Sequence, residues 1–165
     1  GRRVARQGAA ATPAIAALRA RFDRAGAPVV YVNDNFTHWQ GEFQDLVSRC
    51  MAAGGIPARI ATRLRPAAHH YYILKPKHSA FLATALPVLL GRLGVRRLAI
   101  TGLAADSCVL ATAQDANMRE YGVWVPGDCV AAQTEARRKR SLALLASSLN
   151  AHVAASVRVP ELFPA

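Results

Sequence analysis

Cys108 is the residue of this sequence whose position best suits covalent chemistry. It follows the apolar run Leu98–Thr101 and a turn of small residues, and helical periodicity begins directly after it, at Val109. In open α/β sheets, ligands bind at the carboxyl ends of the strands, which is where this pattern places the thiol. The first turn of a helix also offers unpaired N–H groups, which favour a thiolate and can bind an oxyanion. Cys108 is therefore a candidate nucleophile, and a small buried core residue is the alternative.

Lys75 is expected at the same edge of the sheet. It ends the apolar run at 71–74 and is followed by Pro76, which cannot donate a ladder hydrogen bond. An ammonium beside a thiolate stabilises the anion and can polarise a substrate carbonyl. An ordinary exposed lysine is the alternative, although the chain contains only three lysines and two of them, Lys75 and Lys77, lie in this segment.

The elements that must position these two residues alternate between helix and strand. Helices are predicted over residues 13–25, 41–54, 84–93, 109–121 and 135–149, and strands over 29–32, 71–74, 98–101, 123–125 and, at an edge, 153–157. A loop rich in Arg and Pro is expected to follow Gly55. Strands and helices joined by short connections are typical of βαβ units. The sequence therefore predicts one α/β domain over residues 1–165. It is expected to have three layers (αβα), with a mostly parallel, doubly wound sheet between two layers of helices.

Composition limits the partners and the location that we expect. The chain has 165 residues and a formal net charge of +11, but its arginines are spread along the sequence instead of clustering on one element. This pattern favours a solvated basic surface, so no nucleic-acid partner is expected. No apolar run approaches the roughly 18 residues of a membrane span. Three cysteines form no disulfide framework, which indicates a reducing, cytoplasmic location.

Two segments together resemble the isochorismatase-like cysteine hydrolases, the superfamily of nicotinamidase and N-carbamoylsarcosine amidohydrolase. They are Lys-Pro-Lys-His-Ser-Ala-Phe at 75–81 and Thr-Gly-Leu-Ala-Ala-Asp-Ser-Cys-Val-Leu-Ala-Thr-Ala-Gln-Asp-Ala at 101–116. Residues 29–36, residues 127–130 and the element order also match, so the resemblance covers nearly the whole chain. It implies a three-layer α/β hydrolase of small amides that uses a Cys-Asp-Lys triad and no cofactor.

The resemblance also assigns roles to individual residues. Cys108 would be the nucleophile and Lys75 the lysine of the triad. A cis peptide bond would join Leu103 to Ala104, and the amides of Ala104 and Cys108 would form the oxyanion hole. A thiolate would attack the substrate, an amine would leave, and water would hydrolyse the acyl-enzyme. Family members that cleave a vinyl ether lack this cysteine, so Cys108 argues against that branch.

The aspartate of the triad has no counterpart in this sequence. In the family it ends a first strand, whereas the first element predicted here is a helix. We therefore expect that strand, with its aspartate, to precede Gly1. Asp34, at the end of the strand at 29–32, is the nearest substitute, although that position belongs to the substrate or metal region in the family. A catalytically degenerate member, acting as a ligand-binding or oligomer-forming module, is the alternative function.

A pocket for a small amide is expected near the end of that strand. Phe36 stands where the metal motif of nicotinamidases has a histidine, and the spacing of His38, His69 and His70 matches no tight ligand motif, so no metal is expected. The residues predicted to line the pocket are Asp34, Phe36, His38 and Trp39. A surface loop held in place by two aromatic rings is the alternative for the last three. By resemblance the protein is expected to form a homo-oligomer, a dimer or a tetramer.

The remaining cysteines and two acidic residues have structural interpretations. Cys50 and Cys129 are expected in the core. Asp106 and Asp128 are expected to serve turns or caps.

Overall fold

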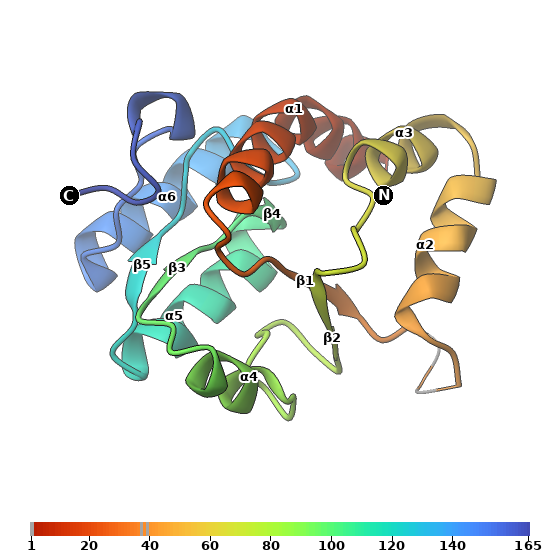
Figure 1. The fold of residues 1–165 in the computed structure, drawn as a ribbon. Helices are drawn as coiled ribbons and strands as arrows, with labels where there is room; N and C mark the ends of the chain where they lie inside the picture. Colours follow the sequence, from red (N-terminus) through yellow and green to blue (C-terminus); the bar gives the residue numbers. More distant parts are fainter. Residues whose placement is uncertain (1, 37, 39) are drawn as a thin grey trace.

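Three parallel strand pairs form the centre of the computed structural model, which describes residues 2–36, 38 and 40–165 (Figure 1). The pairs are β1 (Val30–Asp34) with β2 (Tyr71–Lys75), β3 (Arg97–Ala99) with β5 (Gly122–Trp124), and β4 (Gly102–Leu103) with β6 (Val130–Ala131). Parallel pairing requires a crossover between the two strands, and helices supply it here.

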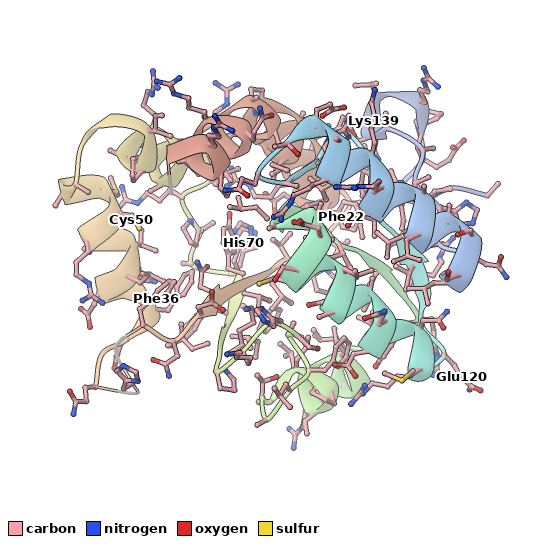
Figure 2. The ribbon with its side chains drawn as sticks, turned by 180° about the vertical axis from the view of Figure 1, so that it is seen from behind. Phe22, Phe36, Cys50, His70, Glu120 and Lys139 are labelled. Carbon is pink, nitrogen blue, oxygen red and sulfur yellow. The ribbon has the colours of Figure 1, made fainter. Side chains whose placement is uncertain are left out.

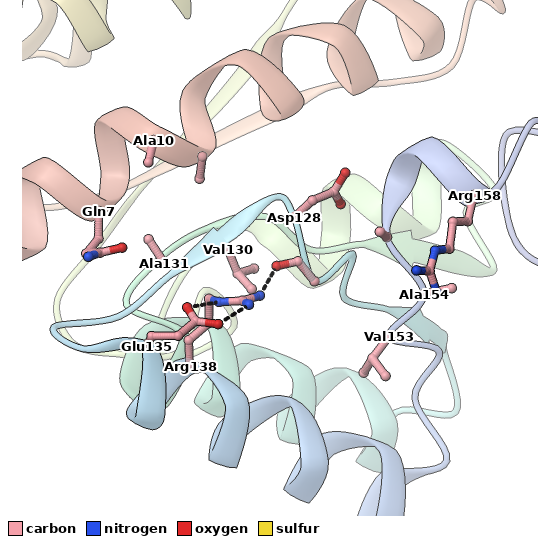
Figure 3. Close-up of a pocket in the computed structure, with 13 residues that line it drawn as sticks. Gln7, Ala10, Asp128, Val130, Ala131, Glu135, Arg138, Val153, Ala154 and Arg158 are labelled. Atoms are coloured by element: carbon pink, nitrogen blue, oxygen red, sulfur yellow. Dashed lines mark hydrogen bonds and ion pairs between the residues drawn. The ribbon is translucent and has the colours of Figure 1, made fainter.

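Six α-helices and two short helical turns are present in the described residues. They are α1 (Arg2–Arg24), α2 (Phe43–Ala52), α3 (Gly55–Arg63), α4 (Leu86–Arg92), α5 (Leu110–Met118) and α6 (Glu135–Leu149), with the π-helix η1 (Ala105–Val109) and the 3₁₀ turn η2 (Ser156–Arg158). β6 lies between α1 on one side and α6 on the other (Figure 3). The α/β class predicted from the sequence is therefore confirmed. None of the described helices is long and apolar enough to cross a membrane.

Two groups of buried apolar side chains hold the layers together. The larger group joins strand residues such as Ile73 and Val123 to helix residues such as Leu90, Val109 and Leu145. The smaller group packs α1 against the carboxyl-terminal segment and consists of Leu18, Trp124, Cys129 and Val159. Burial of one side chain of this size contributes roughly 1.5–3 kcal/mol of transfer free energy. The two groups therefore stabilise the packing of the helices against the strands.

The predicted start of the first helix at Pro13 is wrong. α1 already begins at Arg2 and carries Pro13 in its interior. Proline removes one backbone donor from the helix. The three residues at 9–11 are alanines, however, and alanine has the highest helix propensity of all residue types. Thr12 Oγ1 also donates to the carbonyl of Gly8 over 2.8 Å, in the turn before Pro13.

The loop predicted after Gly55 is wrong over residues 55–63, which form α3. Ile56 and Ile60 are spaced by four residues and lie on one face of this helix, which packs against α1. Pro57 falls in the first turn, where a missing N–H costs no internal hydrogen bond. The apolar pair therefore outweighs the Arg and Pro content that favoured a loop.

The predicted edge strand at 153–157 is also wrong. An isolated bridge between Trp124 and His152 is followed by η2. The backbone of Ser156 has other partners, because its N–H donates to Asp128 over 2.7 Å and its carbonyl accepts from Arg21 over 3.2 Å. These side-chain contacts take the positions that a ladder would use.

Candidate active site

Cys108 lies in η1, directly beyond the carboxyl end of β4. The peptide bond between Leu103 and Ala104 is cis, at the position that the family resemblance implied. The N–H groups of Ser107 and Val109 both donate to the carbonyl of Ala104 over 3.1 Å. A π-helix closes its turns with one more residue than an α-helix and is often found at functional sites. The sequence predicted a helix beginning at Val109, and this wide turn precedes it.

Lys75 is the last residue of β2 and has a buried side chain, 5% exposed. Its Nζ donates to the Asp34 carboxylate, to the Lys77 carbonyl over 3.2 Å and to Cys108 Sγ over 3.5 Å. An ammonium has three N–H bonds, so these three acceptors use all of them. The structure therefore brings together the two residues that the sequence proposed as nucleophile and triad lysine.

Asp34 reaches Lys75 because the two residues are partners in the parallel register of β1 and β2. Its side chain is 43% exposed, so one side of the carboxylate faces solvent. Asp34 was predicted as a pocket residue and as the nearest substitute for the triad aspartate. Its observed position joins Asp34, Lys75 and Cys108 in one chain of contacts.

The two segments that carry the family resemblance are joined along their length. Ser79 Oγ donates to the Asp115 carboxylate, and the N–H of Ala80 donates to Thr112 Oγ1 over 3.0 Å. These contacts attach the loop after β2 to one face of α5. They position Lys75, at the start of the loop, against Cys108, at the start of the helix.

The loop after β1 is more open than a closed pocket wall would be. Phe36 is 69% exposed and extends from this loop (Figure 2). His38 is exposed and has a positive φ of 49°. Trp39, the fourth predicted pocket residue, lies outside the described residues. Asp34 and Phe36 line a hollow of about 10 Å³, which has room for about one water molecule.

The larger cavity is lined by a different set of residues (Figure 3). It has a volume of about 650 Å³ and is lined by α1, β6, the first turn of α6 and residues 153–155. Arg138 closes one wall by binding the carboxylate of Glu135 over 2.6 and 2.8 Å and the carbonyl of Gly127. Its lining residues do not include Cys108, Lys75 or Asp34. We therefore do not assign the thiol chemistry to this cavity, although it is the larger of the two.

The protein-family model described as the Isochorismatase domain matches residues 1–156. This chain belongs to the isochorismatase family. It is 37% identical over 134 residues to YaaI of Bacillus subtilis (strain 168), named as an uncharacterized isochorismatase family protein, and the match covers 81% of this chain and 73% of YaaI. It is 34% identical over 86 residues to the ureidoacrylate amidohydrolase RutB of Acinetobacter baylyi. That match covers 52% of this chain but 35% of RutB.

Solved structures share the fold of this isochorismatase-family chain. The N-carbamoylsarcosine amidase of Thermoplasma acidophilum matches with a TM-score of 0.73 and 28% identity, over 94% of this chain and 87% of that one. The nicotinamidase SaPncA of Staphylococcus aureus matches with a TM-score of 0.67 and 22% identity, over 88% and 82% of the two chains. At that identity the second likeness shows the fold alone.

His69 and His70 of this family member gather around Asp23 instead of around the thiol. Asp23 Oδ1 lies 2.8 Å from His70 Nε2 and 3.3 Å from His69 Nε2. The N–H of Ala67 donates to His70 Nδ1 over 2.9 Å, so the ring proton of His70 is on Nε2 and donates to Asp23. A metal ion would need the lone pair of that nitrogen. The cluster therefore fits a hydrogen-bonded link from α1 to the loop before β2, with His70 in the interior (Figure 2).

The charge state of Asp23 agrees with this link. Burial would raise the pKa of the carboxyl group, but hydrogen bonds from His70 and His69 outweigh it and lower the pKa.

Sequence reasoning missed one neighbour of the thiol, His78. Its Nδ1 lies 3.1 Å from Ser107 Oγ and 3.9 Å from Cys108 Sγ. His78 could have been suspected from the sequence because it lies three residues after Lys75 in one of the two motif segments. Spacing alone, however, does not reveal which way a loop side chain points.

Proposed function

We propose that this protein is a cysteine hydrolase that cleaves the C–N bond of a small amide through a Cys108 thiolate. The observation that carries the proposal is the 3.5 Å contact between Cys108 Sγ and the buried Lys75 Nζ at the carboxyl end of the strands. The names of an amidase and an amidohydrolase among its relatives support a hydrolase acting on amides.

The proposed reaction has two halves. The Lys75 ammonium stabilises the Cys108 thiolate, which attacks the substrate carbonyl carbon. The amides of Ala104 and Cys108, at the start of η1, are proposed to donate to the resulting oxyanion. As the C–N bond breaks, the nitrogen takes a proton from solvent and leaves as a neutral amine. Water then attacks the thioester, the C–S bond breaks, and the carboxylic acid and the thiolate are released while one proton returns to solvent.

We also propose a carboxylate for the triad among the described residues. Asp34, the nearest substitute for the aspartate of the family, accepts from Lys75 Nζ and is its partner in the register of β1 and β2.

The test is a panel of small amides and ureido compounds offered to the full-length protein and to Cys108→Ala. We expect turnover of at least one compound and its loss by about 10⁴-fold or more in the variant. Cys50→Ala, which removes a thiol from α2, is the matched control and should keep full activity. Absence of any turnover that depends on Cys108 would instead favour a non-catalytic, ligand-binding module.

Oligomeric state is a separate part of the proposal. We expect a dimer or a tetramer, which light scattering after gel filtration would measure. A monomer across the micromolar range would contradict it.

A further inference from the structure

The turn η1, which carries Cys108, is attached to α6 through side chains of that helix. Ser141 Oγ donates to the carbonyl of Ala105 over 3.0 Å, and Arg137 Nη1 lies 3.4 Å from Asp106 Oδ2. The Arg137 side chain is half-exposed, so solvent weakens its attraction to Asp106. Ser141 and Ala105 are both buried, where a hydrogen bond is electrostatically stronger than in water. The hydroxyl of Ser141 therefore contributes more to the attachment of this turn.

The oxygen that Ser141 binds is the one that distinguishes a π turn from an α turn at this place. In an α-helix the N–H of Val109 would donate to the carbonyl of Ala105, four residues back. It donates instead to the carbonyl of Ala104, five residues back, over 3.1 Å. The Ala105 oxygen, which the α-helical register would assign to Val109, accepts from Ser141 Oγ. The position of this hydroxyl therefore favours the wide turn over the narrow one.

The contact between thiol and ammonium depends on η1 from the side of the thiol. Lys75 is held separately, by its place at the end of β2 and by its hydrogen bonds to Asp34 and to the Lys77 carbonyl. Cys108 lies three residues after Ala105 within η1, so a change in the register of this turn moves Sγ relative to Nζ. The 3.5 Å distance between these two atoms therefore depends on the wide turn.

We propose that Ser141 is a positioning residue for Cys108. Its hydroxyl, supplied by α6, holds η1 in the wide register and thereby keeps the thiol beside the Lys75 ammonium. The inference rests on the proposed thiol chemistry and adds no step to it, because Ser141 acts through the backbone of η1 and not on the reacting atoms. Loss of the hydroxyl should preserve the fold but weaken the stabilisation of the thiolate.

The test uses two substitutions that disturb the same buried position in different ways. Ser141→Ala removes the hydroxyl, whereas Ser141→Thr keeps it and adds a methyl group. Both should lower the midpoint of urea unfolding, the first by leaving an acceptor without its donor and the second by overpacking. Alkylation of Cys108 by iodoacetamide at pH 6 should slow by about tenfold in Ser141→Ala alone. At pH 10, where the thiolate forms without the help of Lys75, the wild-type protein and both variants should agree within about twofold.

A double variant tests whether Ser141 acts through Lys75. Two substitutions that remove the same contact are not additive. In the Lys75→Met background, where the ammonium is absent, Ser141→Ala should therefore slow alkylation at pH 6 by less than about twofold. Ser147→Ala, which removes an exposed hydroxyl from the same helix, is the matched control and should leave every rate unchanged.

Four results would overturn the role of Ser141 alone. They are wild-type alkylation of Ser141→Ala at pH 6, equal slowing of this variant at pH 6 and pH 10, equal slowing in Ser141→Thr, and undiminished slowing in the Lys75→Met background. If Cys108 of the wild-type protein reacts no faster than Cys50, the proposed thiol chemistry itself fails, and the role of Ser141 fails with it.

Discussion

Cys108 and Cys129 lie at opposite ends of one parallel strand pair, and their surroundings differ accordingly. Cys108 follows the carboxyl end of β4, is half-buried and contacts the Lys75 ammonium. Cys129 precedes the amino end of β6, is fully buried and lies beside the Asp128 carboxylate. Burial first, and the charge of Asp128 in addition, raise the pKa of the Cys129 thiol to about 12. The thiol beyond the carboxyl end of β4 is therefore partly exposed beside an ammonium, whereas the thiol before the amino end of β6 is buried beside a carboxylate.

Asp128 itself is an anchor for the carboxyl-terminal segment. Burial would raise its pKa, but Ser156 donates from both Oγ and N–H over 2.7 Å, and the net effect is a lowered pKa. This agrees with the structural role predicted for Asp128 from the sequence.

The largest effect that follows from the comparison is a difference in alkylation rate. With iodoacetamide at pH 7.5, Cys108 should react at least about 10³-fold faster than Cys129. A thiol with a pKa of about 12 is a thiolate in only about one part in 10⁴ to 10⁵ at that pH, and the thiolate is the reactive form. Mass spectrometry of peptides over time measures both rates together. Labelling of Cys129 or Cys50 ahead of Cys108 would contradict the assignment.

A smaller effect is expected when the charge beside Cys108 is removed. Lys75→Met keeps most of the buried aliphatic stem but removes the ammonium 3.5 Å from Sγ. Alkylation of Cys108 should slow by about tenfold, because the thiolate loses its nearest positive charge. Lys139→Met makes the same change at an exposed position and serves as the control. Equal rates in the two variants would show that Lys75 does not activate the thiol.

The smallest effect concerns the other end of the strand pair. Asp128→Asn should lower the free energy of unfolding by about 1–2 kcal/mol at pH 7, because hydrogen bonds from Ser156 to a charged acceptor are weakened. The lowered pKa of folded Asp128 means that its carboxylate stabilises the fold above the unfolded value of about 3.9, and that this stabilisation is lost as the pH falls through the folded pKa.

Urea titrations at pH 7 and pH 3 measure this difference. The difference in the free energy of unfolding between wild type and Asp128→Asn should be smaller at pH 3 than at pH 7. Glu161→Gln, at an exposed acid, should change neither curve. If this difference in the free energy of unfolding were the same at both pH values, the destabilisation would come from altered packing and not from the lost charge.

Local patterns predicted the elements with clear boundaries. α6 begins and ends as expected, since Thr134 caps its first turn by accepting from the N–H of Arg137 and Asn150 takes a left-handed conformation after its last residue. The contact between Cys108 and Lys75 was also expected, because Lys75 ends one parallel strand, β2, and Cys108 follows the carboxyl end of another, β4.

Features that depend on contacts between distant segments could not be predicted in the same way. The π-helix at η1 is supported by Ser141 of α6, whose Oγ donates to the carbonyl of Ala105 over 3.0 Å. The direction of His78 depends on the path of the loop that Ser79 and Ala80 attach to α5. Neither contact leaves a periodic signal in the sequence.

The π-helix also makes the site sensitive to chain length. One residue corresponds to a rotation of about 100° around a helix axis. Deleting Asp106 or Ser107, which are not part of the buried core, would allow an ordinary α-helical turn but would turn the thiol away from Lys75. The number of residues between β4 and α5 therefore determines the direction of the Cys108 side chain. We expect a deletion in this segment to be harder to compensate than a substitution.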